Sequence, residues 1–170
     1  NVYIQIGCHG EKSPGMLPWN RWPSTTVAEP VVSKVTRVGS PFGGLFYMMI
    51  GEDDDEQISV YQLKCKFKNC CQCPRFVKGS DVHKATKDIQ VPWAEIETSN
   101  SIITLPSDLF RKIDISPIAD NLEQFVYNIE NFISIKWDSK FRVVFDIIGE
   151  KGNPIISYPI IFSLDEFDDL

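Results

Sequence analysis

The sequence lacks the motifs that would assign a catalytic function directly. Its 170 residues contain two histidines, and neither lies in the His-Glu-x-x-His pattern that marks a zinc peptidase helix. A Gly-x-Ser-x-Gly nucleophile elbow and a phosphate-binding loop are also missing. The Gly43-Gly44 pair is not followed by the lysine that a nucleotide would need, so close backbone packing explains it better. We therefore predict no catalytic residues in this chain.

Long apolar runs and clustered basic residues are scarce as well. The run Leu45–Ile50 is far shorter than the roughly 20 residues that a membrane-spanning helix needs, so we predict no transmembrane segment. Lys and Arg number 17 against 23 Asp and Glu, for a net charge of -6. No stretch has the density of Lys and Arg that phosphate binding requires, and we expect no nucleic-acid partner.

The sequence has no Asn-x-Ser/Thr glycosylation acceptor, and four of its five cysteines crowd into residues 65–73. Cysteines this close in sequence pair poorly with each other, so a disulfide framework is not expected. Both observations favour an intracellular, reducing compartment.

The composition is that of a globular domain, with 43% hydrophobic, 12% aromatic and 24% charged residues. Five consecutive acidic residues at 52–56 are expected to form a hairpin tip, and the acidic tail from Asp165 to Leu170 is expected to be solvated. Runs rich in β-branched or alternating apolar residues predict strands at 2–6, 31–38, 45–50, 57–67, 101–105, 143–148 and 155–162.

One strong helix is predicted, with Ser116 as N-cap and Pro117 at the first helical position. Short helices are expected within 82–89 and 107–113. The helical spacing of apolar residues predicts that four side chains of the long helix belong to the core, each costing about 2–5 kcal/mol on truncation to alanine. These are Leu122, Phe125, Ile129 and Phe132. Exposure of this face would instead indicate that another subunit or a further lobe covers it.

The order of these elements predicts an α+β fold. The chain is mostly β at first and then β-α-β after residue 100, so a lobe boundary is expected near residues 95–100.

Cysteine and histidine side chains supply the candidate metal ligands. Cys65, Cys70, Cys73 and His83 contain enough donor atoms for a tetrahedral zinc site. The spacing Cys-Cys-x-Cys differs from the usual Cys-x2-Cys of zinc knuckles, and free cysteines filling a loop or sheet edge are the alternative. Cys8-His9 is a second candidate pair after the first strand.

Tryptophans offer a possible ligand-contact surface. Trp19, Trp22 and Trp93 could stack on a glycan, and the first two lie in a proline-rich stretch. The alternative is that these rings clamp the loop onto the body of the domain.

Several segments, in order along the chain, resemble known families. Residues 2–9, VYIQIGCH, resemble the opening strand of TRP-channel-associated-factor proteins, and residues 40–47, SPFGGLFY, resemble the PFGGLIY strand of enhancin-like metallopeptidases. The same peptidases have a PWAEL…ILTVPS stretch similar to residues 91–97 and 102–107. Their RVVAD…YPIM segment is similar to residues 142–146 and 158–160.

The resemblance implies the front half of an enhancin-like, mucin-degrading zinc peptidase unit, in which a β-rich lobe precedes a zincin-like lobe. A β-rich, sandwich-like antiparallel lobe would then cover residues 1–98, and residues 99–170, with the helix from Ser116 and the strand 143–148, would begin the zincin-like β-α-β lobe. In that family the His-Glu-x-x-His helix follows the YPIM segment, and no position up to Leu170 matches it. No zinc ligand or catalytic glutamate is therefore carried over.

Two functions follow from this resemblance. We expect a non-catalytic interaction or structural module, a pseudoenzyme-like part of a multi-subunit complex with a protein partner and no cofactor of its own. The alternative is a truncated portion of a zinc metallopeptidase acting on glycoproteins, with zinc and the motif beyond residue 170. Enzyme status stays open between these two readings.

Overall fold

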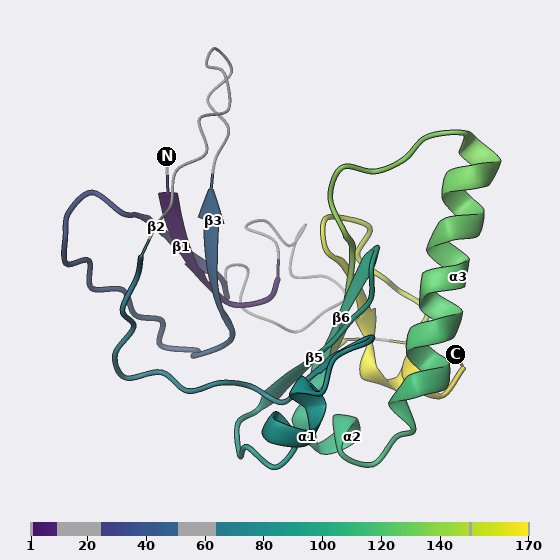
Figure 1. Cartoon of the computed structure of the whole chain (residues 1–170), viewed down its shortest axis with the longest axis horizontal. Coiled ribbons are helices and arrows are strands. Elements are labelled where there is room, and N and C mark those ends of the chain that lie inside the picture. The colour runs from purple at the N-terminus through teal and green to yellow at the C-terminus, as the bar shows by residue number, and fades with distance from the viewer. Residues whose placement is uncertain (1, 10–24, 51–63, 150, 170) are drawn as a thin grey trace.

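The structure of the chain is a computed structural model that describes residues 2–9, 25–50, 64–149 and 151–169 (Figure 1). Of the predicted features, the acidic run 52–56 and both Trp19 and Trp22 lie outside the described residues.

A small antiparallel sheet opens the chain. Its strand order is β2-β1-β3, with β1 (Val2–Ile6) in the centre between β2 (Val27–Pro30) and β3 (Phe46–Ile50). The turn after β1 depends on glycine, because a Cβ on Gly44 would lie 3.0 Å from the Cα of Gly7. The φ angles of Gly7 and Gly44 are both positive, at +111° and +123° respectively. The expected close backbone packing of the Gly43-Gly44 pair is confirmed at Gly44 and is wrong at Gly43, where an added Cβ would meet no atom within 4 Å.

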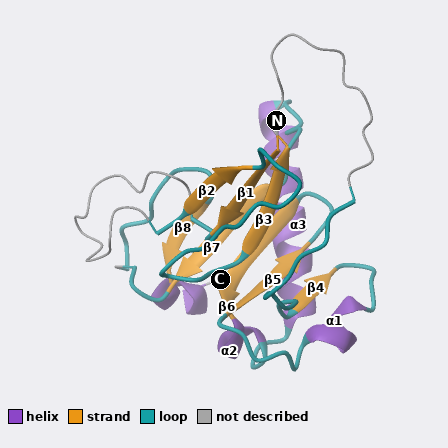
Figure 2. Ribbon diagram, turned by 90° about the vertical axis from the view of Figure 1, so that its left-hand side faces the viewer, coloured by secondary structure: helices purple, strands orange, loops and turns teal. Residues whose placement is uncertain are grey.

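A larger mixed sheet follows, in the order β4-β5-β6-β7-β8 (Figure 2). β5 and β6 pair antiparallel, and the other neighbours pair parallel. The chain crosses from β6 to β7 through the long helix α3, as parallel neighbours require. The strands are β4 (Arg75–Val77), β5 (Trp93–Glu97), β6 (Ser101–Pro106), β7 (Phe141–Asp146) and β8 (Ile160–Ser163).

Helices accompany the larger sheet. α1 (Val82–Thr86) and α2 (Ser107–Phe110) are short, α3 (Ile115–Ile133) is long, and a 3-10 helix covers Leu164–Asp169. Two sheets with segregated helices make an α+β fold, and that prediction is confirmed.

The larger sheet is covered on both faces. Alternate residues of its central strands point toward α3, among them Ile96 on β5, Leu105 on β6 and Phe145 on β7, and these form the main core with Ala119. The intervening residue Val144 packs on the opposite face against Cys8, from the turn after β1. The layers are therefore α3, the larger sheet and the small sheet, as Figure 1 shows.

Two predicted strands are wrong or unsupported where the structure describes them. Residues 31–38 form no strand, and Val32 and Val35 are 81% and 77% exposed. Their β-branched side chains favour extended backbone, but no strand of either sheet pairs with these residues. Residues 57–63 lie outside the described structure, and residues 64–67 are irregular.

Several element boundaries also differ from prediction. The long helix begins at Ile115 with Asp114 as N-cap, so Ser116 and Pro117 lie inside its first turn. Proline is tolerated there because the first amides of a helix have no intrahelical acceptor. The tail was expected to be solvated, but Phe167 is buried and packs edge-on against Phe145 at 5.1 Å. That apolar contact holds the 3-10 helix against the sheet.

The predicted core face of α3 is only partly correct. Leu122 packs against the main core, and Ile129 is half-buried. Phe125 and Phe132 are 52% and 90% exposed, so their assignment to the core is wrong. The apolar stripe of the helix is wider than the strip that contacts the sheet.

The predicted boundary between two lobes falls at residue 98. That residue lies in the turn between β5 and β6, which are antiparallel neighbours in one sheet. The division into residues 1–98 and 99–170 stays a prediction.

Two phenylalanines, buried Phe110 of α2 and exposed Phe132 of α3, test which apolar side chains stabilise the fold. Phe110, which is 1% exposed, should cost about 3–5 kcal/mol of unfolding free energy on truncation to alanine because a cavity remains. Phe132→Ala should change it by less than about 0.5 kcal/mol, since this ring is 90% exposed. Urea unfolding of both variants measures the difference. Equal losses in the two variants would contradict this packing.

Glu123 joins α3 to the turn between β5 and β6. One of its carboxylate oxygens accepts hydrogen bonds from the Ser99 amide at 3.1 Å and hydroxyl at 2.6 Å, and the other contacts Lys78 Nζ. The hydrogen bond from Lys78, then those from Ser99, lower the pKa of this carboxyl to about 2. The charged form is therefore the one that the fold favours.

Glu123→Gln should make the unfolding free energy less dependent on pH in the acid range. The native pKa of about 2 lies below the unfolded value near 4.3, so Glu123 stabilises the fold above about pH 4.3 and loses this effect as pH falls toward 2. The variant should be less stable than the native chain at pH 6, with the gap narrowing by pH 2.5 in urea unfolding. Glu29→Gln, on exposed β2, is the control for removing a charge. A gap that is constant with pH would contradict the role of ionised Glu123.

Candidate functional site: a buried polar cluster between the sheets

Three potentially reactive side chains meet where the small sheet packs on the larger one. His9 Nε2 lies 2.5 Å from Asp146 Oδ2, and His9 Nδ1 lies 3.6 Å from Cys8 Sγ. Asp146 is the last residue of β7, and its other oxygen accepts a hydrogen bond from the Ile148 amide at 2.9 Å. The contacts place a thiol, an imidazole and a carboxylate in one row.

Local backbone contacts fix the position of this row. The His9 carbonyl accepts a hydrogen bond from Thr26 Oγ1 at 2.9 Å, and the Gly7 amide donates to the Leu45 carbonyl at 2.8 Å. The chain after β1 is thereby held against both of its neighbours in the small sheet. The His9 ring also meets the edge of Trp93, with ring centroids 6.2 Å apart.

A cysteine beside a histidine that is oriented by a carboxylate is the arrangement used to activate a nucleophile. Here Cys8, His9 and Asp146 are 2%, 5% and 0% exposed. A substrate has no approach to the sulfur in this conformation. The arrangement instead joins the small sheet to the end of β7 through a buried polar contact.

A second polar group lies on the same face of the larger sheet. The Tyr47 hydroxyl donates a hydrogen bond to Glu95 Oε1 at 2.8 Å, and Arg142 Nη2 reaches the same oxygen at 3.3 Å. The Arg142 guanidinium stacks over the Tyr47 ring, 4.5 Å from its centre. Thus β3 of the small sheet is attached to β5 and β7 of the larger one.

Burial, followed by the charge of Glu95, raises the pKa of Tyr47 well above its ordinary value. Tyr47 is therefore a neutral phenol across the physiological range, and its hydroxyl donates a hydrogen bond to Glu95. Arg142 Nε is buried and finds no hydrogen-bond acceptor among the described residues. Its charge is balanced through Nη2 and the Tyr47 ring instead.

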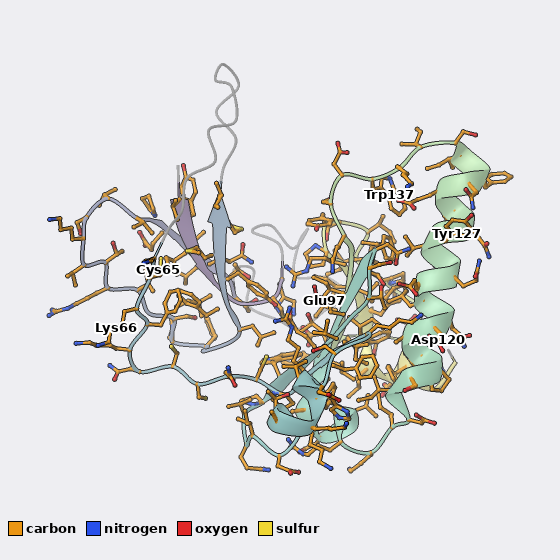
Figure 3. The ribbon with its side chains drawn as sticks, viewed as in Figure 1. Cys65, Lys66, Glu97, Asp120, Tyr127 and Trp137 are labelled. Atoms are coloured by element: carbon orange, nitrogen blue, oxygen red, sulfur yellow. The ribbon has the colours of Figure 1, made fainter. Side chains whose placement is uncertain are left out.

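Glu97 forms the polar edge of the same face (Figure 3). Lys140 Nζ donates to Glu97 Oε1 at 2.6 Å and to the Thr98 carbonyl at 2.7 Å, and Arg75 contacts the second Glu97 oxygen. Burial alone would raise the pKa of this carboxyl, but the hydrogen bonds from Lys140 and Arg75 lower it overall. Glu97 is thus an ionised acceptor between two cations.

The structure does not bring the four candidate zinc ligands together. Cys65 and Cys70 are exposed, and Cys65 Sγ lies 3.7 Å from Met48 Sδ. Cys73 is half-buried, and burial raises the pKa of its thiol. His83, on α1, packs edge-on against Phe76 and Phe110 at 5.9 and 5.4 Å.

Within the described ranges, no three His, Cys, Asp or Glu side chains are grouped closely enough to hold a metal ion. A metal role for Cys65, Cys70, Cys73 and His83 stays a prediction. So does the glycan contact. Trp93 is half-buried against His9 and the core that contains Cys8 and Val144, whereas Trp19 and Trp22 fall outside the described residues.

Sequence reasoning missed Tyr47, Glu95, Arg142 and Asp146. For two of these residues, the surrounding sequence contains a pattern that could have identified them. Glu95 alternates with apolar residues in Trp93–Glu97, and Asp146 directly follows the apolar run Val143–Phe145. A charge in a strand that is buried on both faces needs a partner from another element. The sequence does not say which element provides it.

The contact between His9 and Asp146 makes a direct stability prediction. His9→Phe should lower the unfolding free energy by about 3–5 kcal/mol because it removes one partner of a buried carboxylate. His83→Phe is the matched control, since that ring packs only against aromatic rings in the contacts seen here, and it should cost much less. Urea unfolding at pH 7 measures both. A loss for His83→Phe as large as that for His9→Phe would contradict the role of the pair.

Comparisons of the sequence with known proteins give one family match and several similar proteins. Residues 1–61 match the family model of the N-terminal domain of M60-like peptidases. The TRPM8 channel-associated factor homolog of Danio rerio is 28% identical over 95% of this chain and 18% of its own length. The Xenopus laevis homolog is 24% identical over 99% of this chain and 19% of its own length.

TRPM8 channel-associated factor 3 of Mus musculus is 26% identical over 61% of this chain and 11% of its own length. The chain thus spans less than a fifth of the length of these relatives. No solved structure matches it. In the part of the chain that the structure describes, no helix has the length and hydropathy to cross a membrane. The chain is similar in sequence to TRPM8 channel-associated factors, and its first 61 residues match the N-terminal domain of M60-like peptidases.

Proposed function

We propose that this chain is a non-catalytic interaction module, the front part of an M60-like unit that acts within a larger assembly. The observation that supports this most directly is the use of its reactive side chains. Cys8, His9 and Asp146 are buried in contacts that join the two sheets. A module of this kind contributes its outer surface, rather than a catalytic centre, to function.

The names of the relatives suggest the class of partner. They are called TRPM8 channel-associated factors, and we extend to this chain a partner of the same kind, an ion-channel polypeptide. Folded surfaces with several exposed aromatic side chains are suited to protein contacts, because aromatic residues are enriched at interfaces. Phe125, Phe132 and Tyr158 are exposed side chains of this type.

A second candidate function is a portion of a zinc peptidase that acts on glycoproteins. The match of residues 1–61 to the N-terminal domain of M60-like peptidases favours it. In this case the zinc-binding helix would belong to a longer polypeptide, and the present residues would form a scaffold beside the substrate.

Two assays on the purified chain separate these functions. Incubation with a mucin-type glycoprotein and added zinc should give no cleavage by mass spectrometry, since no His-Glu-x-x-His motif is present. Immobilised chain should bind detergent-solubilised mouse TRPM8 saturably in surface plasmon resonance, whereas an unrelated solubilised membrane protein should not bind. Zinc-dependent cleavage, or the absence of saturable channel binding, would overturn the proposal.

A further inference from the structure

Ser40 lies in an exposed, irregular segment between β2 and β3. Residues 31–44 form no strand or helix, and most of them are exposed. Figure 1 shows most of this segment on the side of the small sheet that faces away from the larger sheet. A Cβ added at Gly39 or at Gly43 would meet no atom within 4 Å. The backbone on both sides of Ser40 therefore has open space beside it.

The proline that follows Ser40 sets the local backbone. A residue that precedes proline is kept away from helical backbone angles and favours an extended geometry. Pro41 then occupies the second position of a turn, in which the Gly43 amide donates to the Ser40 carbonyl at 3.2 Å. Ser40 Oγ accepts a hydrogen bond from the Phe42 amide, also at 3.2 Å. The hydroxyl thus lies at the entrance of an exposed turn.

The fold distinguishes Ser40 from the other Ser-Pro dipeptides of the chain. The sequence has three, beginning at residues 13, 40 and 116, and the first lies outside the described residues. Ser116 is in the first turn of α3, between Ile115 and Ala119, which are 5% and 0% exposed and belong to the main core. Drawing Ser116 out of the helix would disturb these core contacts. Ser40 belongs to no helix or strand, so its segment needs no such opening.

We propose that Ser40 is a phosphorylation site for a proline-directed serine kinase. Such kinases require a proline directly after the serine, and Pro41 meets this requirement. Phosphoryl transfer also depends on positioning the hydroxyl in line with the γ-phosphorus, which an accessible serine outside regular secondary structure allows. This inference goes beyond the proposed function and does not depend on it.

The modification adds charge to a basic segment. Ser40 Oγ attacks the γ-phosphorus of Mg-ATP, the bond from that phosphorus to the β–γ bridging oxygen breaks, ADP leaves, and the hydroxyl proton passes to the catalytic aspartate of the kinase. The phosphoserine carries a charge of about -2. Residues 31–44 contain Lys34 and Arg37 and no acidic residue, so the phosphate would cancel most of their charge. Its oxygens could accept the Phe42 amide that now donates to Ser40 Oγ.

The test incubates the purified chain with a cyclin-dependent kinase and Mg-ATP, in a Ser13→Ala background that leaves Ser40 and Ser116 as the Ser-Pro sites. Synthetic peptides of residues 34–46 and 110–122 measure how well the kinase accepts each sequence without the fold. Tandem mass spectrometry should locate phosphate on Ser40, at a rate within about tenfold of that of its peptide. Ser116 in the chain should react more than about tenfold more slowly than its peptide, because the first turn of α3 must open first.

Matched variants and two comparisons decide the outcome. Ser40→Ala should remove the phosphate, whereas Ser116→Ala should leave the rate at Ser40 unchanged, since the two serines lie in separate segments. Circular dichroism checks that each variant folds. Absence of phosphate on Ser40, or a rate there that is more than about tenfold below that of its peptide, would overturn the proposal. Preferential modification of Ser116 would overturn it as well, because the fold would then favour the wrong serine.

Discussion

The carboxylate of Asp146 is fully buried, and much of the architecture depends on how its charge is accommodated. A buried carboxylate is tolerated only with hydrogen-bond partners, since transfer of an unpaired charge from water costs several kcal/mol. His9 provides one partner, from the turn after β1. The larger sheet therefore needs the small sheet for more than apolar cover, because its strand β7 ends in a carboxylate whose partner, His9, follows β1 of the small sheet. Tyr47, which donates to Glu95, adds a second polar link between the same layers.

These contacts between the sheets bear on function because they use Cys8, His9 and Asp146, the side chains best suited to catalysis. A thiol, an imidazole and a carboxylate in one row would be suggestive in an open cleft, yet here they lie inside a packed interface. Burial that makes such a contact stabilising also denies a substrate access to it. The outer surface is left to carry function, which is the physical basis for proposing an interaction module.

The two sides of α3 likewise differ, since one side stabilises the fold and the other is exposed to solvent. Toward the sheet, Ala119 and Val126 are completely buried and fix the helix in place. Phe125 and Phe132 lie about 100° and 120° around the helix from Val126, on a side that the sheet does not cover, and they remain exposed. Apolar area of this kind is unfavourable in water, so this side of the helix is well suited to contact with another polypeptide.

The sequence by itself determined the local elements that have strong periodicity. The α+β class, the long helix, β1, β3 and β6 follow from spacing and composition, and the resemblance of several ordered segments to enhancin-like proteins agrees with the comparisons. Propensity also predicted a strand at residues 31–38, where the structure has none. Strand formation requires a neighbour with unpaired backbone groups, and the residue types in one segment do not reveal whether such a neighbour is available.

The tertiary structure alone decided which side chains meet. Nothing in the spacing of residues 9 and 146 indicates that His9 and Asp146 touch, because their contact forms only when the two sheets pack. The same holds for Tyr47, Glu95 and Arg142, which come from three strands. Whether Phe132 lies in the core or in solvent was likewise undecidable from helical periodicity. Periodicity gives the direction of a side chain around the helix axis, whereas its exposure depends on which part of the helix circumference the sheet covers.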